Sequence, residues 1–462
     1  MLFLLIIALN TESGDCMQTR LSGRNLLFIG TMLFGLFFGA GNLIFPIYLG
    51  QQAGGHVGAA IIGLLITGIG LPLLGVIGMG LTRSDGVFDL AQRVNRPYAY
   101  CFTILLYFTL GPLFAMPRLA TTAFQIGLVP FVSRSLQPGV LLGFSVGFFG
   151  LTWLLALNPG RIMTYVGKWL TPIFLLLLGA LMLVALFKPM GGLTATARGA
   201  YAAHPLLTGF TEGYNTMDAL ASLAFGIVVI DAIRALGVTD PGQIATDTIK
   251  AGFISMSLMA LIYALLAIIG TMSLGTLAPA ANGGVTLAQI AAHYFGPFGN
   301  LLLALIVIIA CLKTSIGLTS AFGDTLHGMF PKLSYRLLIT VACVIPAILA
   351  NVGLTQLIRY STPLLMFLYP LAIVLILLAV CSPWLGTSRW LFGMTTAWTL
   401  IPAMLAGINA LPRTLTTTGI GHALVELNQH LPLATLGLGW SVPALIGLLI
   451  GLVMSRYPRR PA

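Results

Sequence analysis

Apolar residues fill most of the chain in long runs that short polar breaks separate. Each run approaches or exceeds the ~20 residues that a helix needs to cross the hydrocarbon core of a bilayer. The pattern therefore predicts an all-α polytopic protein with about twelve membrane spans and no separate soluble domain. The expected spans are residues 25–49, 57–81, 98–127, 139–157, 164–187, 215–236, 249–272, 297–322, 336–354, 361–381, 388–411 and 434–455.

The first run carries residues that weaken a membrane helix near its centre. Gly39, Gly41 and Asn42 lie in its middle, and Pro46 follows. Glycine is ~1 kcal/mol worse than alanine inside a helix, and an interrupted helix at this depth needs protein or a wet cavity around its freed backbone groups. Because secondary transporters build their sites at such interruptions, we predict a binding site here. The alternative is close helix packing, since Gly35 and Gly39 also form a G-x-x-x-G pattern.

A second run echoes the first. It opens with Asp218 and passes through Ser222 and Gly226, which predicts a second interrupted helix. An odd number of spans separates the two interrupted runs, so their directions are inverted. This offset predicts two halves related by an axis in the membrane plane.

One lysine lies in the middle of the run 297–322. The side chain of Lys313 is far from both ends of that run, so it cannot easily reach the membrane interface. A central lysine costs at least a few kcal/mol unless it lines a cavity or meets an acceptor, and we therefore predict a functional role for it. Solvation near a span end explains four other charged residues equally well or better: Asp218 and Asp231, Arg118 and Asp324.

Composition and charge narrow the class of protein. The chain of 462 residues is 58% hydrophobic and 7% charged, with a net charge of +11, whereas soluble domains carry roughly 25% charged residues. Most Lys and Arg residues fall in the alternate loops that share a side with the termini. This bias predicts that both termini are cytoplasmic, so the positive charge reflects topology and does not indicate nucleic-acid binding.

Other classes find little support in the sequence. The chain has no G-x-x-x-x-G-K-[ST] or H-E-x-x-H motif, and most of its cysteines lie in or beside apolar runs, which argues against a disulfide framework. A membrane-embedded enzyme would need clustered acid–base groups inside the spans. An ion channel would need a repeated selectivity motif, which two unlike interrupted runs do not provide.

Several segments resemble the bacterial branched-chain amino acid:cation symporters, the LIV-II carriers of BrnQ type. The segments are Gly39–Pro46, Leu49–Gly54, Gly213–Gly226, Ala310–Leu318 and Asn351–Ile358. The resemblance extends over nearly the whole chain after Met17. It implies a LeuT-like fold of the amino acid-polyamine-organocation superfamily, with two inverted five-helix repeats plus two helices. It also implies multi-pass insertion in the bacterial plasma membrane.

The function implied by this resemblance is import of leucine, isoleucine and valine, driven by Na⁺ or H⁺. The alternative is a carrier of the same fold for another amino acid or amine. The expected partners are the small-molecule substrate and the lipid bilayer. Nothing in the sequence indicates a cofactor, a metal other than Na⁺, a nucleic acid or an obligate protein partner.

The resemblance also implies roles for individual residues. The substrate would be bound by Gly39, Ala40, Gly41, Asn42, Ser222, Ala224, Phe225 and Gly226, where the last four correspond to an unwound sixth helix. The cation or its substitute would involve Gly35, Phe38, Asn42, Ala310, Lys313 and Thr314. Asp218 would act in gating or coupling.

Lys313 departs from the family pattern. The alignment implied by the resemblance places Lys313 and Thr314 where two hydroxyl residues would bind a second sodium. An ammonium group there can substitute for the ion, and a buried ammonium can release its proton. We therefore expect Lys313 to be a surrogate cation or a proton carrier.

The chain is accordingly divided into five parts. They are a cytoplasmic N-terminal segment 1–24, of which 1–16 is expected to be a start-site extension, a first repeat 25–187, a second repeat 188–381, two further helices within 382–455, and a basic cytoplasmic tail 456–462.

Overall fold

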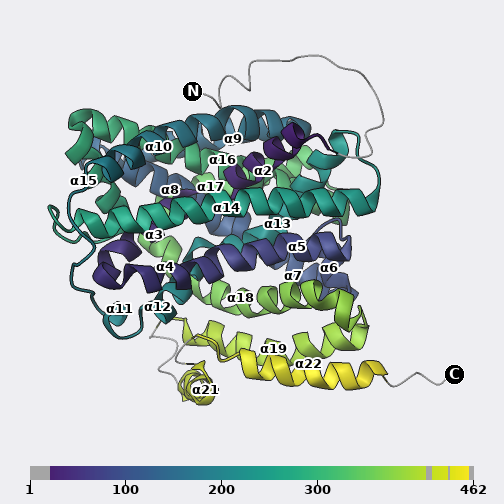
Figure 1. Cartoon of the computed structure of the whole chain (residues 1–462). Helices are drawn as coiled ribbons and strands as arrows, with labels where there is room; N and C mark the ends of the chain where they lie inside the picture. The colour runs from purple at the N-terminus through teal and green to yellow at the C-terminus, as the bar shows by residue number, and fades with distance from the viewer. Residues whose placement is uncertain (1–20, 413–418, 435–436, 457–462) are drawn as a thin grey trace.

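The computed structural model describes residues 21–412, 419–434 and 437–456, and every regular element within them is a helix. Figure 1 shows the long helices lying side by side along one common direction, with the connections at their two ends. The expectations for residues 1–16 and for the tail beyond Arg456 fall outside the described residues.

Each predicted run has a helical counterpart. These helices are α2 (Gly23–Phe37) with α3 (Ala40–Ala53), α4 (Val57–Leu65) with α5 (Leu71–Thr82), α7 (Arg96–Phe108) with α8 (Ala115–Gly127), α9 (Gln137–Ala156), α10 (Thr171–Phe187), α12 (Pro205–Glu212) with α13 (Asp218–Ala235), α14 (Pro241–Ser273), α16 (Pro297–Met329), α17 (Tyr335–Leu349), α18 (Leu354–Leu385), α19 (Arg389–Asn409) and α22 (Ser441–Arg456).

Shorter elements join or follow these helices. Four are α-helices in the connections: α6 (Val87–Gln92), α11 (Ala200–Ala203), α15 (Gly283–Phe295) and α21 (Gly419–His430). The others are 3₁₀ or π segments: η1 (Gly54–His56), η2 (Ile66–Gly70), η3 (Thr109–Leu113), η4 (Val129–Phe131), η5 (Pro159–Arg161), η6 (Met163–Leu170), η7 (Gly213–Thr216) and η8 (Ala350–Val352).

The helical runs differ in whether they are long and apolar enough to cross a membrane. Nine helical runs of the described residues are long and apolar enough to cross a membrane, or ten if the bent pair α12 and α13 counts as one. Two shorter apolar helices, Gly23–Phe37 and Ser441–Ser455, add to these. The continuous run Ala40–Thr82 includes the turn at Gly54, whose φ is +50°. A count of twelve spans stays a prediction.

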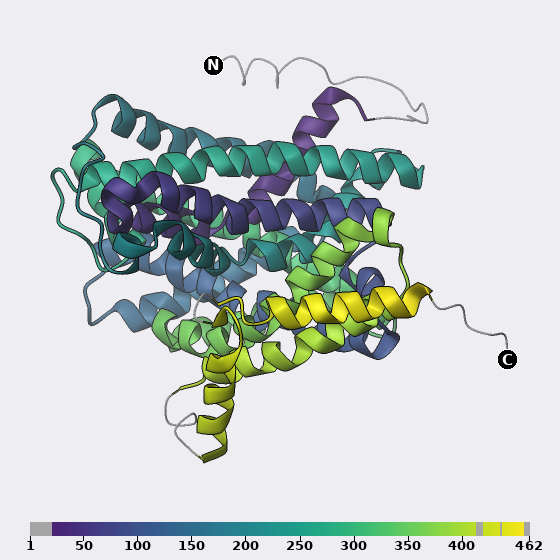
Figure 2. The same ribbon diagram turned by 60° about the horizontal axis from the view of Figure 1, so that its bottom comes forward.

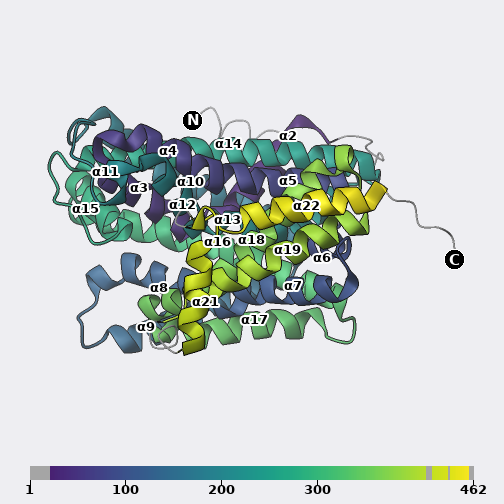
Figure 3. The ribbon, with the colours of Figure 1, turned by 90° about the horizontal axis from the view of Figure 1, so that it is seen from below.

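The two ends of the helical bundle differ in their connections. Helix α6 and the end of α22 lie at one end, and α11 and α15 lie at the other (Figure 1). We call these the α6 end and the α15 end. Figure 2 shows that α2 crosses the other long helices at a steep angle, with its first residues standing away from the bundle. Seen from below, α9 and α17 form one edge of the molecule and α14 the opposite edge, with α13, α16 and α18 between them (Figure 3).

Glycine permits very close packing between α3 and α14. A Cβ atom at Gly50 would lie 1.9 Å from the carbonyl oxygen of Ala267, and one at Gly270 would lie 2.1 Å from the carbonyl oxygen of Ile47. Both distances are far below van der Waals contact, and both obstacles are backbone atoms. The two helices can therefore approach this closely only while both positions remain glycine.

We expect Gly50→Ala to destabilise the protein by about 1–3 kcal/mol, the usual effect of overpacking, because the added methyl group would force α3 away from α14. Gly58→Ala is the matched control, since a Cβ at Gly58 in neighbouring α4 meets nothing within 4 Å. Thermal unfolding of the two purified variants in detergent measures the difference. Equal unfolding temperatures would show that the α3–α14 contact is looser than described.

Candidate functional site

The first predicted interruption is present. Helix α2 ends at Phe37, Phe38 and Gly39 are not helical, and α3 begins at Ala40. The backbone N–H of Gly39 donates a hydrogen bond of 3.0 Å to Oδ1 of Asn42, which caps the new helix. The prediction of a broken helix near Gly39 is therefore confirmed, and Pro46 lies within α3 without ending it.

The second interruption exists, but at another place. Helices α12 and α13 are bent by 40°, and the break is at Met217, which adopts the left-handed conformation with φ 64° and ψ 10°. The predicted unwinding from Ser222 to Gly226 is wrong, because α13 is continuous from Asp218 to Ala235. The span also begins earlier than the predicted residue 215, at Pro205.

The small residues of α13 serve packing. A Cβ at Gly226 would lie 2.2 Å from the sulfur of Met79, so this glycine lets α5 approach. The Ser222 hydroxyl donates to the carbonyl of Ala219 in its own helix, at 2.7 Å. The carbonyl of Ala224 accepts a 2.9 Å hydrogen bond from the hydroxyl of Tyr107. These contacts explain why glycine and serine occur there without unwinding the helix.

A buried hydrogen-bond cluster joins the two interruptions. Asn42 Nδ2 donates to Asp218 Oδ2 at 2.8 Å, and the hydroxyl of Tyr263 on α14 donates to the same oxygen at 2.7 Å. Asn42 Nδ2 also donates to the hydroxyl of Tyr263. The cluster thus fixes the start of α3 to the start of α13 and both to α14. Solvation near a span end was the alternative explanation for Asp218, but the residue is buried.

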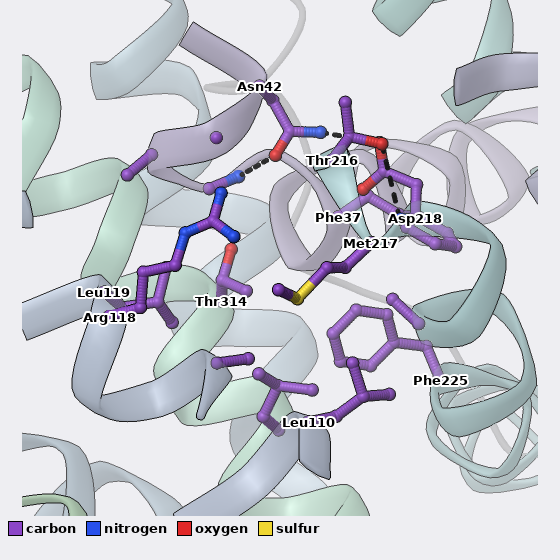
Figure 4. A pocket seen from close by; sticks show the side chains of 16 residues that line it. Phe37, Asn42, Leu110, Arg118, Leu119, Thr216, Met217, Asp218, Phe225 and Thr314 are labelled. Atoms are coloured by element: carbon purple, nitrogen blue, oxygen red, sulfur yellow. Dashed lines mark hydrogen bonds between the residues drawn. The ribbon is translucent and has the colours of Figure 1, made fainter. Parts of the chain in front are cut away.

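A cavity of about 50 Å³ lies between the two interruptions (Figure 4). This volume holds a few water-sized spheres. Its lining comes from α2, α3, α7 to α8, α12 to α13 and α16, and consists of Phe37, Gly39, Ala40, Gly41, Asn42, Leu110, Ala115, Arg118, Leu119, Thr216, Met217, Asp218, Ala221, Phe225, Thr314 and Leu318.

The cavity includes many of the predicted site residues and leaves out others. Those that line it are Gly39, Ala40, Gly41, Asn42, Asp218, Phe225 and Thr314. Those that do not line it are Gly35, Phe38, Ser222, Ala224, Gly226, Ala310 and Lys313. Their roles in binding remain predictions.

Two lining residues that sequence reasoning missed are Arg118 and Met217. Arg118 was expected near a span end, but α8 brings it to the cavity (Figure 4). The span that contains it is kinked at Gly111, whose φ of −88° and ψ of −119° are not helical. The adjacent Gly111-Pro112 pair is a sequence signal for such a kink, and it could have drawn attention to this span.

The cavity therefore has two charged sides and an apolar part. Figure 4 shows Arg118 on one side and Asp218 with Phe225 on the other. Leu110, Leu119 and Leu318 contribute apolar surface. The backbone N–H groups in the first turn of α3, which have no carbonyl group of the same helix to donate to, add positive potential at the start of this helix. A small molecule that carries both charges and an alkyl group matches this lining, and the cavity of about 50 Å³ must widen to hold one.

Lys313 lies outside this cavity. Its side chain is 0% exposed, and Nζ is 3.8 Å from the ring centroid of Phe174 and 5.4 Å from that of Phe34. Within the described part of the chain, Nζ has no hydrogen-bond partner. The ammonium group therefore contacts aromatic rings of α2 and α10, which attract a cation far less than oxygen ligands would.

Thr314 faces the other way. A Cβ at Gly39 would lie 3.2 Å from its hydroxyl oxygen, so Thr314 borders the first interruption. Thr314 is 8% exposed, and among the described residues its hydroxyl has no partner. Lys313 and Thr314 thus point into different surroundings, and only Thr314 borders the cavity.

Buried hydrogen bonds hold the helices together at the α15 end. Gln51 of α3 is buried, and its Nε2 donates to the hydroxyl of Ser273 on α14 at 3.0 Å. Its Oε1 accepts hydrogen bonds from the N–H of Ala280, at 3.1 Å, and from the hydroxyl of Thr286 on α15, at 2.9 Å. These bonds hold α15 and the segment before it onto α3. We call this group the Gln51 cluster.

The α6 end holds a cavity of its own. A cavity of about 250 Å³ lies there between α2, η5 to η6, α13 and α16. Asp231 and Asp324 are among its lining residues. This cavity begins about one turn of α13 from the central cavity, because Val228 lines the former and Phe225 lines the latter. A cavity of about 480 Å³ lies at the α15 end, between the end of α8, the start of α9 and Asn351 to Gly353, so both ends of the bundle hold open space.

Two interrupted helices that meet at a buried cavity inside a helical bundle are typical of secondary transporters. Residues 22–457 match the model of a family described as branched-chain amino acid transport protein. The chain therefore belongs to this family, and it is a multi-pass membrane protein.

Named relatives agree with this family. The chain is 46% identical to the branched-chain amino acid permease BrnQ of Lactobacillus delbrueckii subsp. lactis, with 93% of this chain and 96% of the relative covered. It is 42% identical to the branched-chain amino acid permease BraB of Bacillus subtilis, with 96% and 98% covered. It is 38% identical to the branched-chain amino acid transport system 2 carrier protein of Pseudomonas aeruginosa, with 96% and 99% covered.

Solved structures show the fold. MhsT in complex with L-phenylalanine superposes with a TM-score of 0.54 at 15% identity, over 94% of this chain and 100% of MhsT. Mhp1, a nucleobase-cation-symport-1 family transporter, superposes with a TM-score of 0.58 at 14% identity, over 93% and 92%. The predicted all-α, LeuT-like architecture is confirmed.

Proposed function

We propose that this protein imports leucine, isoleucine and valine across the bacterial plasma membrane by symport with a cation. The observation that carries the proposal is the central cavity between the two interruptions, which combines Arg118, Asp218 and apolar side chains. An amino acid carries one charge of each sign, and a branched-chain one adds an alkyl group. The relatives' names support the same substrates.

The apolar part of the cavity suits an aliphatic side chain. Phe225 and Phe37 meet edge to face with their ring centroids 5.3 Å apart, and Leu318 lies beside them in the lining. Burying a leucine or isoleucine side chain is worth about 1.5–3 kcal/mol. Since valine, leucine and isoleucine differ by about one methylene group, a pocket of this kind discriminates little among them.

Transport follows by alternating access. The Gln51 cluster holds α15 onto α3 and α14 at the α15 end, and the 250 Å³ cavity lies toward the α6 end. We propose that the α6 end faces the cytoplasm, as do both termini, because the basic loops favour this orientation. Movement of α2, α3, α12 and α13 relative to the other helices would then open the site to each side in turn.

The coupling ion is Na⁺ or H⁺. Thr314 and the non-helical backbone at Phe38 and Gly39 offer oxygen atoms of the kind that Na⁺ prefers. In this structure, Oδ1 of Asn42 accepts from Gly39, and its Nδ2 donates to Asp218 and Tyr263. Asn42 would therefore bind a cation only through the second lone pair of Oδ1. We propose that the ammonium group of Lys313 takes the place of the second sodium ion that the LeuT-like fold can bind.

Competition among substrates in proteoliposomes tests the proposed function. We expect excess unlabelled valine or isoleucine to reduce uptake of labelled leucine by at least about tenfold, and we expect alanine and phenylalanine to have much less effect. Na⁺ and pH gradients imposed separately identify the driving ion. Uptake that valine and isoleucine do not reduce would refute the substrate assignment, and strong inhibition by phenylalanine or alanine would favour another amino acid carrier.

A further inference from the structure

We propose that Arg118 binds the carboxylate of the transported amino acid, and that the substrate therefore lies with its carboxylate toward α8 and the start of α3 and its ammonium group toward Asp218. This inference rests on the proposed function. It adds the orientation of the substrate and a specificity residue on α8.

The guanidinium group of Arg118 has unused hydrogen-bonding capacity in the cavity. Its Nη2 donates to the backbone carbonyl of Asn215 at 3.2 Å, and its Cζ lies 5.2 Å from the ring centroid of Phe45. These two contacts fix the position of the side chain. The ion pairs found among the described residues do not include Arg118, although the Glu212 carboxylate of α12 lies close enough to act on it electrostatically. Since a guanidinium carries several N–H donors, donors other than the one directed at Asn215 can serve an anion in the cavity.

Two further groups beside Arg118 favour an anion. The start of α3 presents backbone N–H groups that no residue of the same helix accepts from, and these attract negative charge. The hydroxyl of Thr314 borders the same region, is nine-tenths buried, and has no partner among the described residues. A hydroxyl group can donate its hydrogen to a carboxylate while its oxygen coordinates a cation, so this role is compatible with the proposed cation site.

Gly41 leaves room for this arrangement. A Cβ at position 41 would lie 3.3 Å from Arg118 Nη2 and 3.2 Å from the ring of Phe45. Any larger residue would therefore press on the guanidinium and its aromatic neighbour together. This contact gives a physical reason for the second glycine of the Gly39-Ala40-Gly41-Asn42 segment, beyond the weakening of the helix.

Asp218 completes the polarity of the site. The hydrogen bonds from Asn42 and Tyr263 both end on its Oδ2, and the carboxylate belongs to the cavity lining opposite Arg118 (Figure 4). An amino acid placed between these two side chains has its carboxylate facing Arg118 and its ammonium group facing Asp218. Its side chain then extends toward the apolar residues Leu110, Phe225 and Leu318.

The test compares leucine with leucinol, which keeps the amine and the alkyl group but has no carboxylate. Binding of both is measured on the full-length protein in nanodiscs. We expect the unmodified protein to prefer leucine clearly. In Arg118→Gln we expect the affinity for leucine to fall by about 10- to 100-fold, the range for one lost charge-assisted interaction, while the affinity for leucinol changes by less than about threefold.

Three further variants test simpler explanations of a loss of binding. Arg336→Gln is the matched control, because Arg336 also lies over an aromatic ring, with its Cζ 6.0 Å from the ring of Trp153, but outside the cavity lining. It is expected to leave both affinities unchanged. Arg118→Lys keeps the charge but loses the planar fork, so we expect an intermediate preference for leucine. If Arg118→Gln does not fold, Arg118→Lys and Gly41→Ala measure the same preference.

The outcomes separate the two proposals. If the unmodified protein binds leucine and Arg118→Gln weakens leucine and leucinol equally, or neither, Arg118 does not bind the carboxylate. A gating role for Arg118 would give that result, since it would not depend on the carboxylate. If the unmodified protein does not bind leucine at all, the proposed function itself fails.

Discussion

Asp218→Asn is expected to reduce concentrative leucine uptake by about 10- to 100-fold while leaving the protein folded. Asparagine keeps the size of the side chain and an oxygen that can accept from Asn42 and Tyr263, so the cluster that joins the two interruptions can persist. The substitution removes the negative charge that faces the cavity. Interactions with a charged partner are worth about 1.5–3 kcal/mol, which sets the expected loss of uptake. Uptake is measured in proteoliposomes under an imposed ion gradient.

Asp247→Asn is the control for this experiment. Asp247 is a carboxylate of α14 that is only 2% exposed. It accepts from Gln243 at 3.0 Å and lies 3.9 Å from Lys250, and it does not line the central cavity. We expect this variant to transport leucine normally. An equal loss of uptake in both variants would mean that replacing any buried carboxylate disturbs folding. Normal uptake by Asp218→Asn would contradict a role of the Asp218 charge in transport.

Lys313→Met is expected to separate stability from ion coupling. The buried ammonium has aromatic rings around it and, among the described residues, no hydrogen-bond acceptor. Methionine fills a similar volume without a charge, and replacing buried ionic groups with apolar ones is often neutral or stabilises by about 1–4 kcal/mol. We therefore expect an unchanged or raised unfolding temperature together with loss of ion-driven accumulation. Thermal unfolding and uptake assays on the same preparation measure both effects.

Lys313→Thr tests the surrogate-cation hypothesis more directly. A hydroxyl at position 313 would replace the charge with an oxygen ligand, so leucine uptake should gain or strengthen a dependence on Na⁺. Lys168→Met is the control, because Lys168 also lies over a phenylalanine ring, at 5.5 Å from that of Phe28, but is exposed. Unchanged ion dependence in Lys313→Thr would contradict the hypothesis.

The sequence predicted most of the fold because membrane helices are specified by local hydrophobicity. Each expected run is helical, and the break at Gly39 follows from adjacent glycines and an asparagine that can cap the next helix. The second break was predicted in the right run but about one turn or more too late. It depends on a left-handed Met217, a conformation that methionine rarely adopts and that composition does not reveal.

The missed parts of the site depend on contacts between distant segments. Arg118 reaches the cavity because its span is kinked at Gly111 and packs against α16, and hydrophobicity alone does not show which residues such a kink brings inward. The surroundings of Lys313 come from Phe34 and Phe174 on two other helices. The sequence showed that Lys313 was unusual, but it could not show that Thr314 and Lys313 face different neighbours.

The Gln51 cluster has a kinetic consequence. Its three hydrogen bonds join α3, α14 and α15 at the end that we assign to the extracellular side. In the proposed mechanism, all of them would have to part before the empty carrier could bind new substrate from that side, whereas release toward the α6 end would leave them intact. We therefore expect the return of the unloaded protein to limit turnover. A cell already containing leucine would then exchange it across the membrane faster than an empty cell could fill.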